Sequence, residues 1–86
     1  MAHPRLVFSE TDEALRMHVR AFLLEYESGS LAVNVSRFIG GEGQPSATDY
    51  RPVATLAEAL THATEMTDKW AAERNAELRA ACGGAR

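Results

Sequence analysis

The sequence contains 86 residues, of which 45% are hydrophobic and 24% are charged, and its formal net charge is −3 at pH 7. A chain of this length forms one small domain with a modest core, so we expect a single domain over residues 1–86. The acidic balance argues against nucleic acid as the main partner, because affinity for a phosphate backbone comes chiefly from clustered Lys and Arg.

The sequence offers no membrane-spanning segment, because its apolar runs are short, and its first residues lack the apolar stretch of a secretory signal. The single cysteine, Cys82, has no partner for an internal disulfide, which fits a reducing compartment. We therefore expect a cytoplasmic protein that does not associate with a membrane.

Residues 12–27 are compatible with a strand or a helix. As a strand, the segment alternates apolar and polar residues, and a bulge near Leu23 would bring Leu24 and Tyr26 onto the apolar face. As a helix, it carries an acceptable apolar stripe and ends at Ser28-Gly29-Ser30. The strand predicts an antiparallel β-meander, and the helix predicts a β-α-β-β-α order. The alternation favours the meander.

Two turns set the register of the predicted meander. A turn at Ser28-Gly29 would place Tyr26 opposite Leu31 and Leu24 opposite Val33. A turn at Thr11-Asp12 would place Phe8 opposite Leu15 and Leu6 opposite Met17. In this register most large apolar residues point to one side of the sheet, which a second layer must cover.

The segment 40–49 is rich in glycine and small polar residues, which predicts a flexible, exposed loop. Residues 50–54 follow it and contain Pro52, which confines any strand there to a sheet edge.

The clearest element is a helix over about residues 55–81. Thr55 and Glu58 have capping-box spacing, and the apolar residues that follow recur at helical intervals. Glu58, His62 and Glu65 lie on the opposite side, which we interpret as solvated. At ~1.5 Å per residue the helix is roughly 40 Å long, longer than a small sheet. Its last turns, including Arg74 and Leu78, should therefore run past the core.

This mixed stripe at the end of the helix predicts a contact surface. Leu78 is apolar, but Arg74 interrupts the stripe, a pattern typical of an interface with a polar rim. We expect this surface to bind a partner, and a second copy of the chain, forming a homodimer, is the occupant that we favour.

A second candidate surface is the polar face of the sheet. In the meander it gathers Arg16, His18 and Arg20 beside Phe22 and Phe38. Arginine and aromatic residues dominate protein interfaces, and the same residue types stack bases in nucleic-acid-binding sheets. The acidity of the chain favours a protein partner and leaves a nucleic-acid-binding sheet, using Arg16, Arg20, Phe22 and Phe38, as the alternative.

Catalytic and metal sites are not indicated. Glu58, His62 and Glu65 have ligand-like spacing, but one helix supplies too few ligands for a carboxylate metal site. Cys82 would need a histidine and an orienting group brought to it by the fold, and no local motif predicts this. We therefore expect no cofactor and no enzymatic activity.

Together these observations predict an α+β domain in which a meander of three to four strands packs against a long C-terminal helix. The function that we expect is that of a small non-catalytic interaction module: a regulator, inhibitor or accessory protein that acts by binding another protein.

Overall fold

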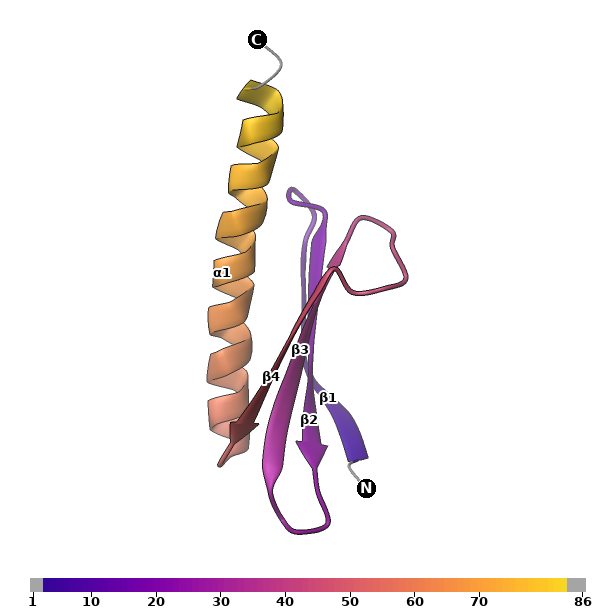
Figure 1. Cartoon of the computed structure of the whole chain (residues 1–86), viewed down its shortest axis with the longest axis vertical. Coiled ribbons are helices and arrows are strands. Elements are labelled where there is room, and N and C mark those ends of the chain that lie inside the picture. The colour runs from indigo at the N-terminus through magenta and orange to yellow at the C-terminus, as the bar shows by residue number, and fades with distance from the viewer. Residues whose placement is uncertain (1–2, 84–86) are drawn as a thin grey trace.

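The computed structural model describes residues 3–83, which form four strands followed by one helix (Figure 1). The sheet order is β1-β2-β3-β4 with every neighbouring pair antiparallel, and α1 lies against one face. This confirms the predicted α+β meander, and the β-α-β-β-α alternative is wrong because residues 17–25 are a strand. The bounds are β1 His3–Asp12, β2 Met17–Glu25, β3 Leu31–Ile39, β4 Ala47–Val53 and α1 Leu56–Gly83.

The helix begins at the predicted cap. The backbone N–H of Glu58 donates to Thr55 Oγ1 at 3.1 Å, and the Glu58 carboxylate accepts from the N–H of Ala54 at 2.8 Å. These two bonds satisfy amides that the first helical turn leaves without intrahelical partners. The helix continues to Gly83, two residues beyond the expected end at Ala81.

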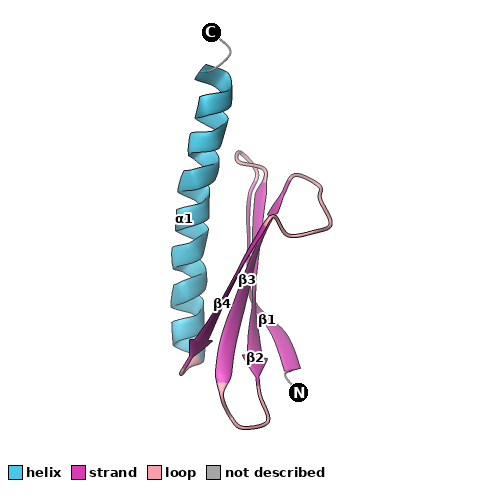
Figure 2. Cartoon of the chain, in the orientation of Figure 1, coloured by secondary structure: helices cyan, strands magenta, loops and turns pink. Residues whose placement is uncertain are grey.

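The core lies between α1 and the central strands (Figure 2). Val19, Val33 and Val35 are fully buried on the helix-facing side of β2 and β3. On α1, the small residues Ala59 and Ala63 are also fully buried, which lets the helix backbone approach the sheet closely. Larger side chains complete the core: Met17, Leu23 and Trp70.

The register between β2 and β3 differs by one residue from the predicted register. Leu23 pairs with Val33 and Glu25 pairs with Leu31, so the predicted pairs of Tyr26 with Leu31 and of Leu24 with Val33 are wrong. A shift of one residue exchanges the two faces of a strand. Leu23 is therefore buried under the helix, whereas Leu24 lies on the other face of the sheet.

A wider turn explains this shift. The N–H of Tyr26 donates to Ser30 O at 3.0 Å and the N–H of Gly29 donates to Tyr26 O at 2.9 Å. Gly29 has a φ of 92°, a conformation that glycine adopts without a side-chain clash. The turn thus spans more residues than the tight Ser28-Gly29 turn that we predicted.

The pairing of β1 with β2 was also predicted incorrectly. Phe8 pairs with Ala21 and Leu6 pairs with Phe22, in place of the predicted partners Leu15 and Met17. The bulge lies in β1, between Leu6 and Phe8, and the pairing of β2 with β3 continues without a bulge near Leu23.

The connection from β1 to β2 is closed by local hydrogen bonds. The Asp12 carboxylate accepts from the N–H of Leu15 at 3.1 Å, and Arg16 has a φ of 53°. The N–H of Gly40, just after β3, donates to Arg16 O at 2.8 Å. The β1–β2 turn and the start of the β3–β4 loop are therefore tied together. This loop ends before Ala47, so residues 47–49, predicted as loop, belong to β4.

The last turns of α1 extend past the sheet (Figure 1), as the length of the predicted helix required. Near this end of the sheet, Arg74 Nε donates to Leu15 O in the β1–β2 turn at 2.9 Å. One turn earlier, the Trp70 ring lies 5.9 Å from the guanidinium carbon of Arg37.

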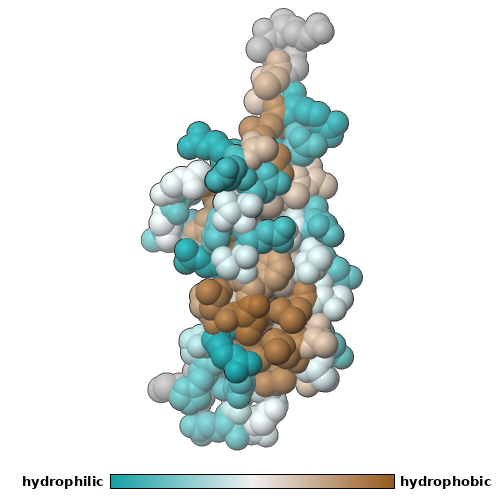
Figure 3. Space-filling model, turned by 180° about the vertical axis from the view of Figure 1, so that it is seen from behind, coloured by the Kyte–Doolittle hydropathy of each residue, from teal (hydrophilic) through white to brown (hydrophobic). Residues whose placement is uncertain are grey.

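Apolar surface remains exposed at the end of the molecule where α1 begins. Figure 3 shows it as a continuous hydrophobic area on the lower half of the rear view. Leu6 is 51% exposed and Leu56 is 40% exposed. Within residues 3–83, no helix combines the length and the apolar character that crossing a membrane requires.

Candidate functional site

The side of the sheet that faces away from α1, here called the outer face, is not covered by any element within residues 3–83. Its positions follow from the pairing register, which alternates between the two faces. They are Pro4, Leu6, Ser9 and Thr11 in β1; His18, Arg20, Phe22 and Leu24 in β2; Ala32, Asn34, Ser36 and Phe38 in β3; and Thr48, Tyr50 and Pro52 in β4.

The outer face has no strand position occupied by Asp or Glu, although the chain contains 12 acidic residues. The acidic residues of the strands all occupy helix-facing positions: Glu10, Asp12, Glu25 and Asp49. The strand positions of the outer face therefore combine apolar, hydroxyl and basic groups, while the acidic residues of the strands lie on the helix-facing side.

His18 is the centre of a hydrogen-bonded cluster at one end of this face. Arg20 Nε donates to His18 Nε2 at 3.0 Å, and the Ser9 hydroxyl lies 3.4 Å from the same nitrogen. Because Nε2 accepts, the proton of the neutral ring is on Nδ1, which donates to Thr11 Oγ1 at 2.5 Å. Both ring nitrogens are thus occupied, and the cluster fixes the direction of the Arg20 side chain.

Phe38 packs against this cluster from β3. The guanidinium carbon of Arg20 lies 5.4 Å from the centroid of the Phe38 ring, within the range of a cation–π contact. The rings of His18 and Phe38 have centroids 6.3 Å apart and are tilted by 50°. Phe38 stays half-buried, so part of its ring is available to a partner.

Two shallow hollows adjoin the His18 cluster. One, of about 370 Å³, lies beside the β1–β2 turn, and the other, of about 280 Å³, lies beside the β3–β4 loop. Both are lined by His18, Gly40 and Gly41; the first adds Thr11, Glu13, Arg16 and Met17, and the second adds Arg20, Phe38, Glu42 and Gly43. The hollows give this end of the outer face a concave relief.

The other end of the outer face is mainly apolar. Leu6 of β1 pairs with Phe22 of β2, and Leu24 lies on the same face. Phe22 and Leu24 are half-buried, whereas Leu6 is exposed. Beside them the hydroxyls of Tyr26 and Tyr50 lie 3.0 Å apart. The hydrogen bond with Tyr50, with smaller contributions from burial and from the charge of Tyr50, raises the pKa of the Tyr26 phenol above its ordinary value.

The structure brings together four of the seven predicted partner-binding residues. Arg16, His18, Arg20 and Phe38 line the two hollows. Phe22 shares their face but lies nearer the apolar end. The remaining two, Arg74 and Leu78, belong to α1, where both are half-buried, and so form a separate surface.

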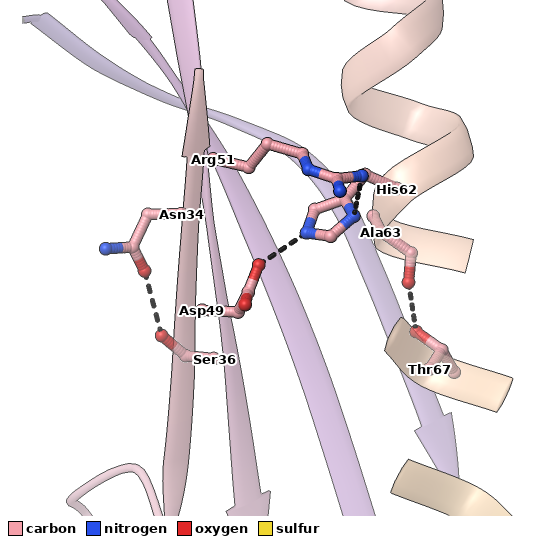
Figure 4. Close-up of polar contacts among 7 residues, drawn as sticks. All are labelled: Asn34, Ser36, Asp49, Arg51, His62, Ala63 and Thr67. Atoms are coloured by element: carbon pink, nitrogen blue, oxygen red, sulfur yellow. Dashed lines mark hydrogen bonds and ion pairs between the residues drawn. The ribbon is translucent and has the colours of Figure 1, made fainter. Parts of the chain in front are cut away.

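His62 is in a different environment from the predicted solvated one. It is 8% exposed and lies between Asp49 and Arg51 of β4 (Figure 4). Its Nε2 donates to the Asp49 carboxylate, and Nδ1 accepts from Arg51 at 3.3 Å. The solvated interpretation was wrong for His62 because the helix turns this side toward β4.

The contacts of His62 with Asp49 and Arg51 leave neither ring nitrogen free to bind a metal. In the part of the chain that the structure describes, no three residues of the ligand-forming types are gathered closely enough to hold a metal ion. We interpret His62 as a structural link that fixes α1 to β4.

Sequence reasoning missed several residues of the outer face, among them Leu6, Thr11 and Tyr50. Tyr50 alternates with Thr48 and Pro52 in a period of two, a signal that identifies them as one face once β4 is recognised as a strand. No local signal predicted the contact of Asp49 with His62, since the fold alone brings them together.

Comparison with protein-family models, with curated proteins and with solved structures finds no match for this chain. The function is therefore argued from the residues of the chain itself.

Proposed function

We propose that this chain is a non-catalytic interaction module that regulates or inhibits a partner protein by binding it against the outer face. The observation that carries the proposal is the Phe38 ring, half-buried and oriented by Arg20 and His18, on a face with no acidic strand residue. Aromatic and arginine side chains held in fixed positions contribute most of the binding energy in many protein interfaces.

The composition of the outer face also indicates the chemistry of the partner. Its apolar end, with Leu6, Phe22 and Leu24, matches an apolar surface, and Arg20 and Arg16 match acidic groups. The expected partner is thus a protein surface that combines apolar side chains with Asp or Glu.

A nucleic-acid partner is the second candidate, and the absence of carboxylates among the strand residues of the outer face favours it. Arg20 beside Phe38 resembles the base-stacking sites of single-strand-binding sheets. However, Arg20 is the only Lys or Arg at the strand positions of this face, too few for a backbone-tracking groove. The protein partner is therefore the better supported.

The test is affinity capture from cells that contain the partner, with a nuclease-treated sample in parallel. The wild-type chain should retain a protein that Phe38→Ala and Arg20→Glu lose, while Lys69→Ala, an exposed change on α1, retains it. Circular dichroism should show that all variants are folded.

Two outcomes would contradict the proposal. Retention that is equal for the outer-face variants and the wild type would place binding elsewhere. Loss of the retained material after nuclease treatment, with affinity falling steeply as salt is raised, would favour the nucleic-acid alternative.

A further inference from the structure

The first strand of the sheet is an open edge. Strand β1 is 10 residues long, and it pairs only with β2 among the described elements. Helix α1 lies chiefly over β2 and β3, so it does not cover the free side of β1. The N–H and C=O groups on that side are available to another strand.

The charges of β1 are divided between its two halves. At helix-facing positions, His3 and Arg5 lie in the first half, whereas Glu10 and Asp12 lie in the second. Neither Arg5 nor Glu10 forms an ion pair with any residue in the range 3–83. Charged side chains on an edge strand can discourage pairing with another chain, but the charges of this strand are complementary to those of an antiparallel copy of itself.

One register satisfies this complementarity. If Arg5 lies opposite Glu10 of a second copy, two-fold symmetry repeats the same pair at the other end of the contact. His3 then lies opposite Asp12, and Val7 lies opposite Phe8.

In this register the bulge in β1 also places the paired side chains of the two copies on the same face of the sheet. Val7 and Phe8 both pack toward the core cluster, whereas Leu6 and Ser9 both lie on the outer face. Counted outward from the middle of the bulge in either direction, the side chains of β1 therefore alternate between the two faces of the sheet in the same order. Arg5 meets Glu10, Leu6 meets Ser9 and Val7 meets Phe8 with each pair on one side of the sheet, whereas a shift by one residue would bring opposite faces together.

Apolar surface beside β1 supports a contact at this edge. His62 turns toward β4, and by helical geometry Leu56 and Leu60 lie on the opposite side of the buried stripe, toward β1. Together with Val7 and Phe8, they form a partly exposed apolar border of the core. A second copy at this edge would cover part of that border.

The opposite edge does not offer the same contact. Strand β4 is shorter, at 7 residues, and contains Pro52, which lacks a backbone donor. Asp49 and Arg51 could also pair between two copies, but both are already bound to His62. Strand β1 contains Pro4 near one end, which removes one donor and leaves the stretch from Arg5 to Glu10 intact.

We propose that two copies of this chain associate through antiparallel pairing of β1 with β1, with Arg5 opposite Glu10 of the second copy. The sheet becomes continuous across the two-fold axis, and both helices lie on the same side. The two outer faces then form one extended surface, and the association does not depend on what that surface binds.

Sedimentation equilibrium on the full chain tests the proposal. The wild type should show a dimer at high micromolar concentration, and the dimer should weaken as salt is raised. Arg5→Glu and Glu10→Arg each place like charges opposite each other at two sites, and each should raise the dissociation constant about tenfold. The double variant Arg5→Glu/Glu10→Arg restores opposite charges and should return the constant to within about threefold of the wild type.

Two control variants locate the contact. Glu73→Arg changes an exposed charge on α1 and should leave the dimer unchanged, and Leu78→Glu should do the same if the contact is at β1. A monomeric wild type would overturn the proposal. So would a dimer that Leu78→Glu dissociates, or one whose single charge changes are not rescued by the double variant.

Discussion

The two faces of the sheet are made from alternate residues of the same strands, yet they differ in burial and in the placement of acidic residues. The helix-facing side holds the fully buried Val19, Val33 and Val35, and the acidic residues of the strands lie around them at its margins. The outer face has hydroxyls, aromatic rings and Arg20, with no acidic strand residue. If the outer face binds the proposed partner, stability and recognition depend on opposite sides of one layer, so substitutions on the two sides should have separable effects.

The largest expected effect comes from a charge placed on the buried side. Val33→Glu puts a carboxylate at a fully buried position without a partner and should lower the free energy of unfolding by about 4 kcal/mol or more. The neighbouring Asn34→Glu points to the outer face and should cost less than about 1 kcal/mol. Urea unfolding of both variants measures the difference, and equal losses would contradict the division between the faces.

The second-largest loss of stability is expected from removing Trp70, the largest side chain of the core. Trp70 is 5% exposed, so Trp70→Ala leaves a cavity and should destabilise the domain by about 3–5 kcal/mol. The adjacent Lys69→Ala, on the exposed side of α1, should stay within about 0.5 kcal/mol of the wild type in the same urea titration. A Trp70→Ala loss as small as that of the control would mean that α1 does not pack as described.

His18 and His62 sharpen the comparison, since each has both ring nitrogens hydrogen-bonded. His62→Ala removes a buried side chain and leaves the half-buried Asp49 without its partner, and it should cost about 1–3 kcal/mol. His18→Ala should cost less, because its partners Ser9, Thr11 and Arg20 are exposed and can bond to water. Thermal unfolding ranks the two variants, and the opposite ranking would refute the structural role assigned to His62.

The smallest effect on stability is expected for Phe38, the residue on which the proposed binding depends most. Phe38→Ala should change the free energy of unfolding by about 1 kcal/mol or less, because Phe38 is only half-buried and a single cross-strand contact contributes little. The same variant should lose the captured protein partner. A large loss of stability with binding retained would reverse the roles of the two faces.

The architecture could be predicted because its signals are local. The capping pair Thr55 and Glu58, the helical spacing after it and the alternation in β2 each depend on residues close in sequence. The register could not be predicted in the same way. Leu23 and Leu24 are equally apolar, so only the geometry of the turn near Gly29 decides which of them is buried.

The candidate site was predicted in part for the same reason. Alternation correctly placed His18, Arg20 and Phe38 on one face of the sheet, whereas Arg16, predicted on the same strand face, lies in the β1–β2 turn. The environment of His62 was missed because a helical pattern gives a residue's direction around the axis, but not what the fold places beside it. Only the position of β4 at the edge of the sheet determines that His62 meets Asp49.

The order of the elements along the chain has a consequence for folding. Each strand pairs with the one that precedes it, so the hairpins can form from contacts close in sequence, which is typically fast. Helix α1, which buries the apolar side of the sheet, is the last element described. During synthesis that side therefore has no cover until α1 has been made, and we expect the docking of Trp70 to complete the core late in folding, as the step that commits the domain to its native state.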